Sequence, residues 1–494
     1  MNGKRRKRHT GFSLVELLVA MAVALILVSA LARFFKYVGD TVSAGRALLY
    51  LTADLHARRV ALEHELRSAT AFSLAGIDGS SSSGYFEIIE GPLRDGSTLN
   101  NPDEQVFGDV DDVLAFTVRS SGQPFRGQLL YFTKMLDPTT VNTAHPKTIY
   151  ALNVLPGTTA PATYSADTLE SDTAEVIYWL TLDDKNQNGR RDYGEYYVLR
   201  RRVLLVRPDV VLDGSYGVLS YPYGAPAAPS VFTIADLSMR RELSKWSTNN
   251  LENLSRRENR FGRNGTALGV VGPPLVGPGP FPNFMLEPEF LPRLKDVVLP
   301  PINGNSYTVF RAEEDIVLSH VVAFDVQVFD PQANMRVINN EVAVAPHDPG
   351  YTQAATALTS GAFIDLGRDM NLPAAQRLNT PFSQASWLQQ NYANALASRG
   401  ISTKAIYDSW SLSYDRDGIN QLTNPNGPNP DPFIDTGSDG LDNNGNGLTD
   451  ELAEFEAPPP YAASLRGIKI TIRVIDPDTR QVSQTTVIAD FTPF

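Results

Sequence analysis

The N-terminus joins a short basic segment to a long apolar one, and this junction constrains the fold more than any other feature. Residues 4–8 are all lysine or arginine, and residues 12–35 form an apolar run in which Glu16 is the only acidic residue. Such a run can cross a bilayer as one helix, which needs about 20 residues. The basic flank favours the cytoplasmic side and places the rest of the chain outside. A carboxylate inside this helix is costly, so we expect Glu16 to have a partner and a function.

The six residues at this junction, Gly-Phe-Ser-Leu-Val-Glu at positions 11–16, resemble the class III leader of type IV prepilins and pseudopilins. The resemblance implies that prepilin peptidase removes residues 1–11 by cutting after Gly11, and that the new N-terminal residue, Phe12, is methylated. It also implies that Glu16 pairs with the N-terminal amine of a neighbouring subunit during assembly. Physical chemistry agrees, because a buried ammonium and a buried carboxylate are each costly alone and tolerable together.

Two other interpretations of the N-terminus remain open. An ordinary secretory signal would use residues 17–28 as its apolar region and Ala30-Leu31-Ala32 as its cleavage site. A plain signal anchor would stay uncut. The secretory interpretation assigns no purpose to Glu16, and the first residue of the mature chain distinguishes the three.

Residues 36–71 are predicted to continue the helix with an amphipathic pattern. The apolar positions recur at spacings of three, four and seven and comprise Ala44, Leu48, Leu51, Leu55, Leu62, Leu66 and Ala69. A helix running without a break from Phe12 would be about 90 Å long at 1.5 Å per residue. Its first half would lie in the membrane or a filament, and its second half would pack on a globular head. The alternative is that Gly39 and Gly45 divide it into two helices.

The chain after residue 71 has the pattern of strands, so the expected fold class is α+β. We expect a long N-terminal helix, with a membrane-spanning first half at 12–35, packed on a large antiparallel β-rich head with insertions. Short runs rich in β-branched and aromatic residues predict the strands of the head over 72–330, at 86–89, 113–118, 129–133, 150–155, 176–182 and 196–206.

Two stretches of the head do not have a strand pattern. Residues 234–246 are expected to form a short helix. The arginines that follow (Arg256, Arg257, Arg260 and Arg263) are predicted to lie on a solvated helix face, because acidic residues interrupt the run. Residues 262–292 are rich in glycine and proline and are predicted to form an irregular arm.

The C-terminal part of the chain predicts a strand pair formed from distant segments. Apolar residues alternate over 322–328 and again over 468–474, and Asp476-Pro477-Asp478 turns the chain into a last strand over 481–491. The ending at 462–494 would complete the head, and it resembles that of the minor pilin PilW and pseudopilin J group. Residues 331–461 are too long for a loop and are interpreted as an insertion, with a helix expected over 383–399.

A calcium-type loop is predicted at residues 184–195, between two expected strands. The segment fits the spacing D-x-[DN]-x-[DN]-G-x₅-E, in which alternate side-chain oxygens surround one side of the ion and a glycine makes the turn. Because the flanks are strand-like, we expect the loop at a hairpin tip, with an affinity of about 10⁻⁴ to 10⁻³ M. The alternative is a polar hairpin turn that binds nothing. The candidate ligands are Asp184, Asn186, Asn188, Arg190 through its carbonyl, Asp192 and Glu195.

A second Asp/Asn-rich segment at 435–451 resembles the calcium loops of thrombospondin type 3 repeats. Oxygen-bearing residues alternate before Gly447, but Ala453 occupies the position of the closing glutamate. So many carboxylates in a small space would repel one another without an ion. The alternative is a disordered acidic loop. The candidate ligands are Asp442, Asn444, Asn446, Leu448, Asp450 and Glu451.

The remaining sequence favours a structural role over an enzymatic one. The formal net charge is −12 and there is no cysteine, so neither nucleic-acid binding nor disulfides are expected. No catalytic motif is complete; His64-Glu65 begins H-E-x-x-H, but Ser68 takes the place of the second histidine. The resemblance at the N-terminus implies a minor pilin or pseudopilin of a type IV pilus or type II secretion-like filament. Taking these features together with the resemblance, we expect it to be stabilised by calcium and not to be an enzyme. The alternatives are a filament-displayed adhesin and, less favoured, a membrane-anchored hydrolase.

The resemblance also implies partners and a location. The expected partners are prepilin peptidase, other pilins or pseudopilins, the inner-membrane assembly platform and the membrane itself. The expected location is the inner membrane, crossed once, with the head outside the cytoplasm, in the periplasm or on a cell-surface filament.

Overall fold

The chain is described by a computed structural model. The described residues are 13–71, 83–91, 108–131, 133–136, 147–152, 164–187, 191–213, 231–242, 245–255, 259–261, 294, 296–302, 305–312, 314–338, 342–348, 351–352, 355–386, 405–409, 445, 447, 461 and 463–491.

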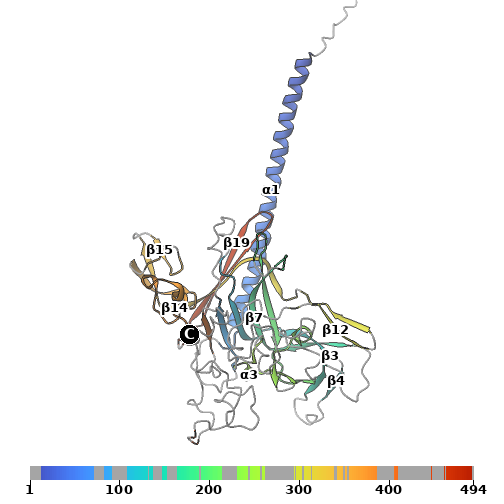
Figure 1. Ribbon diagram of the computed structural model, residues 1–494, viewed down its shortest axis with the longest axis vertical. Helices are drawn as coiled ribbons and strands as arrows, with labels where there is room; N and C mark the ends of the chain where they lie inside the picture. The colour runs from blue at the N-terminus through green and yellow to red at the C-terminus, as the bar shows by residue number, and fades with distance from the viewer. Residues whose placement is uncertain are drawn as a thin grey trace, which may run out of the picture.

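The N-terminal helix α1 (Leu14–Arg67) is continuous over 54 residues and rises out of the head (Figure 1). It begins after the N-cap Ser13 and ends at Ser68, whose N–H donates to carbonyls of the last turn. Gly39 and Gly45 lie inside the helix and do not divide it. At 1.5 Å per residue the helix is about 80 Å long, so the expectation of one unbroken helix is confirmed.

A strongly twisted, mainly antiparallel sheet forms the centre of the head. Its strands are, in sheet order, β17 (Ala405–Asp408), β1 (Phe86–Glu90), β2 (Val113–Arg119), β7 (Thr173–Leu182), β8 (Tyr197–Leu205), β14 (Ile316–Ile338), β18 (Gly467–Ile475) and β19 (Val482–Asp490), with β15 (Val342–Val344) and β16 (Thr356–Ile364) paired to β14. Strands far apart in sequence thus become neighbours, and the predicted α+β class is confirmed.

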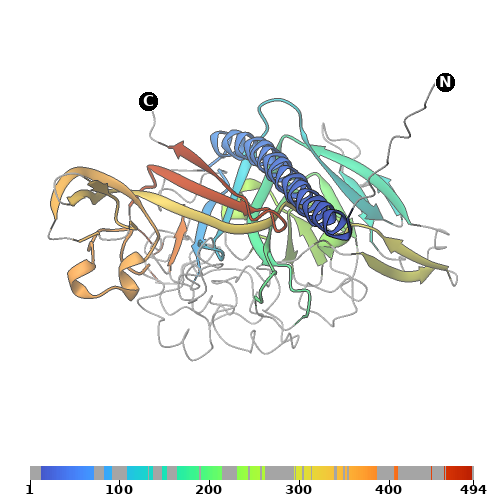
Figure 2. The same cartoon turned by 90° about the horizontal axis from the view of Figure 1, so that it is seen from above.

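The second half of α1 packs on one face of this sheet, alongside β19 (Figure 2). Leu55, Leu62 and Leu66 are at most 2 % exposed and join apolar residues of β2, β14, β18 and β19 in one core. Their spacing is that of the predicted apolar stripe, since residues three, four and seven apart share one helix face. Leu48 belongs to the same stripe but is exposed, so the buried face begins near Leu51.

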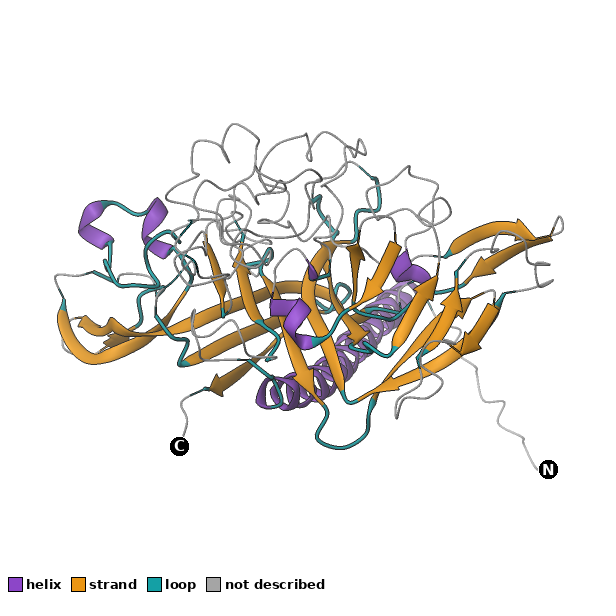
Figure 3. Cartoon of the chain, turned by 90° about the horizontal axis from the view of Figure 1, so that it is seen from below, coloured by secondary structure: helices purple, strands orange, loops and turns teal. Residues whose placement is uncertain are grey.

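The opposite face of the sheet carries a second layer of short elements, while α1 passes behind the strands (Figure 3). These elements include three small sheets and two short helices: β3 (Phe125–Tyr131) with β6 (Ser165–Ser171), β10 (Met239–Glu242) with β11 (Lys245–Thr248), β4 (Thr133–Leu136) with β5 (Thr148–Ala151) and β9 (Val210–Asp213), α2 (Val231–Ile234) and α3 (Leu251–Ser255). A further hairpin pairs β12 (Val297–Ile302) with β13 (Asn305–Val309). Among the described pairs, β5 and β9 are parallel and the others are antiparallel.

The expected strand pair near the C-terminus is confirmed. Val328 lies opposite Ile468 and Val326 opposite Ile470 in the antiparallel pairing of β14 with β18. The turn into β19 is held by Asp476, whose Oδ1 accepts from the N–H of Thr479 at 2.7 Å. The alternating apolar residues from Phe324 to Val328 and over 468–474 face the core that α1 covers, whereas Val322, next to a register shift, lies in a separate small cluster. The register is fixed because a shift by one residue would expose the residues that face the core.

The short helix expected over 234–246 is wrong. Only α2 (Val231–Ile234) is helical there, and the segment continues into the β10–β11 hairpin. Residues 231–239 are all buried, and Leu237 forms a bridge to Leu205 of β8. Packing against the sheet therefore outweighs the helix propensity of Met239-Arg-Arg-Glu-Leu243.

The prediction of a solvated arginine is also wrong at Arg260, which is 1 % exposed. Its guanidinium donates to Asp408 on β17 at 2.7 Å and to Glu87 on β1 at 3.2 Å, and it lies 4.0 Å from the centre of the Tyr85 ring. These carboxylates raise the pKa of Arg260, outweighing burial, which acts to lower it. The other three arginines lie outside the described residues.

The range 331–461, interpreted as an insertion, contributes to the main sheet. It supplies the end of β14 together with β15, β16 and β17, of which β17 forms the edge next to β1. The 3₁₀ turns η6 (Arg368–Asn371) and η7 (Ala374–Gln376) follow β16. Of the helix expected over 383–399, residues 383–386 form a turn and a bend and are not helical. The others lie outside the described residues, as does the arm at 262–292.

Candidate functional site

The first candidate site is the exposed N-terminal half of α1. Over residues 14–43 every side chain is exposed, including Leu25, Ile26 and Leu27 at 64–69 %. Of the described helices, α1 alone is long and apolar enough to cross a membrane. An apolar surface of this extent on a globular protein marks a contact with another chain or a lipid.

Glu16 lies in the first turn of α1 and forms a capping box with Ser13. Its Oε2 accepts from the Ser13 N–H at 2.8 Å, and its own N–H donates to Ser13 Oγ at 3.2 Å. A capping box satisfies two N–H groups that the first turn of a helix leaves open, and a carboxylate there also suits the helix dipole. The predicted cleavage residues, Gly11 and Phe12, lie outside the described residues.

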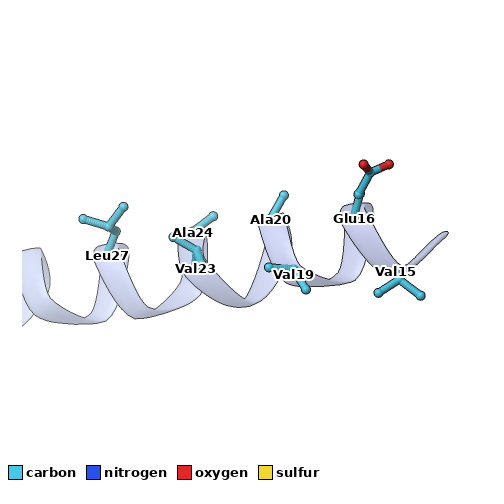
Figure 4. Close-up of a pocket in the computed structure, with 7 residues that line it drawn as sticks. All are labelled: Val15, Glu16, Val19, Ala20, Val23, Ala24 and Leu27. Atoms are coloured by element: carbon cyan, nitrogen blue, oxygen red, sulfur yellow. The ribbon is translucent and has the colours of Figure 1, made fainter. Parts of the chain in front are cut away.

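The helix face beside Glu16 carries small side chains. Glu16 points to the same side of the helix as Ala20, Ala24 and Leu27 (Figure 4). Alanine one turn and two turns after Glu16 leaves this side of the helix open to an approaching helix, because small residues let two backbones come close.

The other end of α1 carries a second acidic residue, Glu65, in a different environment. Glu65 is 7 % exposed and faces the sheet. Tyr178 Oη on β7 donates to its Oε2 at 2.6 Å, and the Arg201 guanidinium on β8 forms an ion pair with it. Burial and the neighbouring Glu65 carboxylate raise the pKa of Tyr178 well above its ordinary value. The sequence offered one sign of this site, because Glu65 falls on the apolar stripe between Leu62 and Ala69.

The predicted loop at 184–195 lies where the sequence placed it, at the hairpin between β7 and β8, where Leu182 pairs with Tyr197. Glu195 is 4 % exposed, and its two oxygens accept from the N–H groups of Lys185 at 3.1 Å and Asp192 at 2.9 Å. The Asn186 amide donates to Asp192 Oδ2 at 2.6 Å. The loop is therefore closed by hydrogen bonds between its own residues.

This geometry accommodates part of the predicted calcium ligand set. Glu195 holds the two sides of the hairpin together, and each of its oxygens has a second lone pair available. Asn186 would have to turn its amide oxygen inward to join Asp184 and Asp192 as a ligand. Asn188 and Arg190 lie outside the described residues, so the calcium site at this hairpin stays a prediction.

The second predicted loop, at 435–451, is described only at Gly445 and Gly447. Both glycines have positive φ, 75° and 89°, a conformation that residues with a side chain adopt rarely. This agrees with a tight turn at Gly447. All six candidate ligands, Asp442, Asn444, Asn446, Leu448, Asp450 and Glu451, lie outside the described residues.

A third group of acidic residues escaped the sequence analysis. Glu90 ends β1, and Asp109, Asp111 and Asp112 come directly before β2. One carboxylate oxygen from each of Glu90, Asp109 and Asp112 lies within 4.8 Å of the other two. We call Glu90, Asp109, Asp111 and Asp112 the buried carboxylate cluster. The sequence signal for this group was three acidic residues within four positions before a strand. The sequence does not show that they are buried, because their burial depends on contacts with β14.

The buried carboxylate cluster is unusual in its electrostatics. Burial, followed by the other carboxylates, raises the pKa of Asp109 and of Asp112 well above their ordinary values. Asp112 is 0 % exposed; its Oδ2 accepts from the Val326 N–H at 2.7 Å, while its Oδ1 accepts no hydrogen bond from the described residues. A buried carboxylate oxygen without a donor is costly.

Comparison with known proteins identifies one segment of the chain. Residues 6–32 match the family model described as the prokaryotic N-terminal methylation motif. The match covers residues 6–8 of the basic flank, Gly11, Phe12, Glu16 and the exposed start of α1. No curated protein matches the chain. No solved structure matches it either.

Proposed function

We propose that this chain is a minor pilin or pseudopilin, a structural subunit of a type IV pilus or type II secretion-like filament. One observation carries the proposal: the N-terminal methylation motif at residues 6–32 continues into a helix whose first half is bare and whose second half is built into a β-rich head. A helix of this kind anchors a head in the membrane first and then packs among other helices in a filament.

The proposed assembly chemistry centres on Glu16. After prepilin peptidase cuts behind Gly11, the methylated amine of Phe12 on a neighbouring subunit would meet the Glu16 carboxylate. In a bundle of apolar helices each charge alone is costly, and the pair lowers that cost. Ala20 and Ala24 beside Glu16 would let the neighbouring helix approach closely. The inner-membrane assembly platform and other pilins are the proposed partners, and the head would lie outside the cytoplasm.

Calcium is proposed as a stabiliser of the head at the loops 184–195 and 435–451. A cation that binds only the folded state adds to its stability by mass action. Without cysteine, the head has no disulfides to limit the freedom of its unfolded chain, so bound ions would have a larger share in stabilising it. Neither loop carries a catalytic motif, and we propose a role without enzymatic activity.

The mature N-terminus provides the first test. Mass spectrometry of the chain purified from its membrane should identify a methylated Phe12 as the first residue. A chain that begins at Arg33 would identify a secretory signal, and an uncut Met1 would identify a signal anchor; either result contradicts the proposal.

The second test is Glu16→Gln, which keeps the shape of the side chain and removes its charge. Incorporation into filaments should fall about tenfold or more, since the neighbour's amine loses its counter-charge. Thermal unfolding of the head should not change. Asp40→Asn, on the same exposed half of α1, serves as the matched control and should assemble normally. Normal assembly of the Glu16→Gln chain would refute the pairing.

A further inference from the structure

The buried carboxylate cluster forms where three segments meet. The register of β1 with β2 pairs Ile89 with Val113, so continuing it by one residue sets Glu90 directly opposite Asp112. Residues 108–112 also run beside β14, with the Phe324 N–H donating to the Asp109 carbonyl at 2.8 Å. Like charges placed directly opposite each other on paired strands are destabilising, so this arrangement needs a compensating charge.

The described residues supply no such charge to Asp109 or Asp112. No described lysine or arginine forms a salt bridge with either carboxylate, in contrast to Asp236, Asp315 and Asp408, which are all paired with arginines. Oδ1 of Asp109 and Oδ1 of Asp112 are both shielded from solvent and accept no hydrogen bond from the described residues. Arginine therefore compensates several buried acids of the head, such as Asp408, whereas the described residues give Asp109 and Asp112 no cation.

The spacing of the oxygens suits a hard divalent cation. Calcium takes oxygen ligands at 2.3–2.6 Å, so two ligands on opposite sides of one ion are about 4.6–5.2 Å apart. The three oxygens from Glu90, Asp109 and Asp112 lie within 4.8 Å of one another, inside that limit. The group offers carboxylate oxygens and no nitrogen or sulfur, which favours calcium or magnesium over zinc or copper.

We propose that Glu90, Asp109 and Asp112 bind one calcium ion inside the head, with Asp111 beside it. This site is separate from the loops at 184–195 and 435–451. The ion would replace mutual repulsion by attraction and connect the end of β1 to the start of β2. Through Asp112, which accepts from Val326, it would also connect these strands to β14. Its effect is structural, since Glu90 and Asp112 are at most 1 % exposed.

The test uses the full-length chain in detergent, stripped of metal with a chelator and then titrated with calcium chloride. The double variant Glu90→Gln/Asp112→Asn keeps side-chain size and removes two ligand charges. It should bind one calcium ion per chain fewer than the wild type by equilibrium dialysis. The rise in melting temperature that calcium causes should also be smaller in this variant, by about 5 °C.

A matched control separates loss of the ion from general loss of stability. Glu175→Gln alters another fully buried acid, whose oxygens accept from Tyr85 Oη at 2.7 Å, Ser238 Oγ at 2.7 Å and the Phe261 N–H at 2.9 Å. This variant should lose stability but bind as much calcium as the wild type. An equal number of bound ions in the wild type and the double variant would overturn the proposal and indicate that the carboxylates share protons.

A second measurement is independent of whether the double variant folds. Anomalous scattering from wild-type crystals grown with calcium chloride should place an ion between Glu90, Asp109 and Asp112. An anomalous map that shows no ion at this position would overturn the proposal. Both measurements use the unassembled chain, so a negative result would not contradict the proposed filament function. In the same way, a negative result of the Glu16 test would not contradict the proposed calcium site.

Discussion

The two halves of α1 show how one helix serves two surroundings. Glu16 and Glu65 are acidic residues on the same helix, and each is set among apolar neighbours. Glu65 is buried and has both a tyrosine and an arginine of its own chain as partners. Glu16 is exposed and forms its capping-box hydrogen bonds with Ser13, three residues earlier. The comparison teaches that the head satisfies its own buried charge, while the projecting half presents a charge that a second molecule can satisfy.

The apolar side chains show the same contrast. Leu62 is 1 % exposed and belongs to the core between α1 and the sheet, whereas Leu27 is 64 % exposed. Equal side chains on one helix therefore contribute differently to the stability of the isolated chain, because only buried area removed from water counts. The following predictions test this division, from the largest expected effect to the smallest.

The largest effect is expected from truncating a leucine in the buried half. Leu62→Ala should lower the free energy of unfolding of the head by about 3 kcal/mol, since it removes a buried side chain and leaves a cavity. Leu27→Ala should leave it unchanged. Urea unfolding of both variants in the same detergent measures the difference. Equal losses would show that the exposed half also packs on the head.

Removing the charge of Glu65 should have the next largest effect. Glu65→Gln leaves the Arg201 guanidinium without its counter-charge. The Arg201 side chain is 26 % exposed. Complete loss of a buried partner costs about 3–5 kcal/mol, and the exposure of Arg201 reduces this to about 2 kcal/mol. Thermal unfolding of Glu65→Gln and Glu16→Gln tests the difference between the two halves of α1, because only Glu65→Gln should lower the melting temperature. A stable Glu65→Gln head would remove the argument that this contact anchors α1.

A smaller effect is expected from removing the Tyr178 hydroxyl, which donates a hydrogen bond to Glu65. Tyr178→Phe removes one buried hydrogen bond while keeping the ring in the core, which should cost about 1 kcal/mol. Tyr50→Phe is the control on the projecting half, where Tyr50 is 76 % exposed. A double-mutant cycle with Glu65→Gln should give non-additive losses, since the two residues contact each other. Additive losses would mean that the hydrogen bond contributes nothing.

The smallest effect is expected from removing the projecting half altogether. A chain that begins at Ala44 keeps the buried stripe of α1 and should unfold within about 0.5 kcal/mol of the full-length chain. It should also be soluble without detergent, because the exposed apolar run is gone. A large loss of stability in this truncated chain would show that residues 14–43 contribute to the head, against the division described above.

Local pattern was sufficient for the parts of this fold that depend on neighbouring residues. The unbroken α1 and its apolar stripe follow a period of 3.6, and β14 and β18 follow a period of 2. The strands β1, β2, β7 and β8 follow short runs rich in β-branched and aromatic residues. The hairpin at 184–195 followed from the strand-like residues on both of its sides. The helix expected over 234–246 failed because residues 234–239 are all buried, with Leu237 bridged to Leu205 of the sheet, and the local pattern does not show that contact.

The sequence alone determined the N-terminal motif, the single acid at Glu16 and the division of α1 into a projecting and a packed half, because each is encoded within a few helical turns. Only the tertiary structure decided which charges are buried together. Arg260 meets a carboxylate 148 residues away, and Tyr178 meets one 113 residues away. The buried carboxylate cluster likewise exists because β14 covers the start of β2. Such contacts depend on which strands become neighbours, and no local periodicity records that choice.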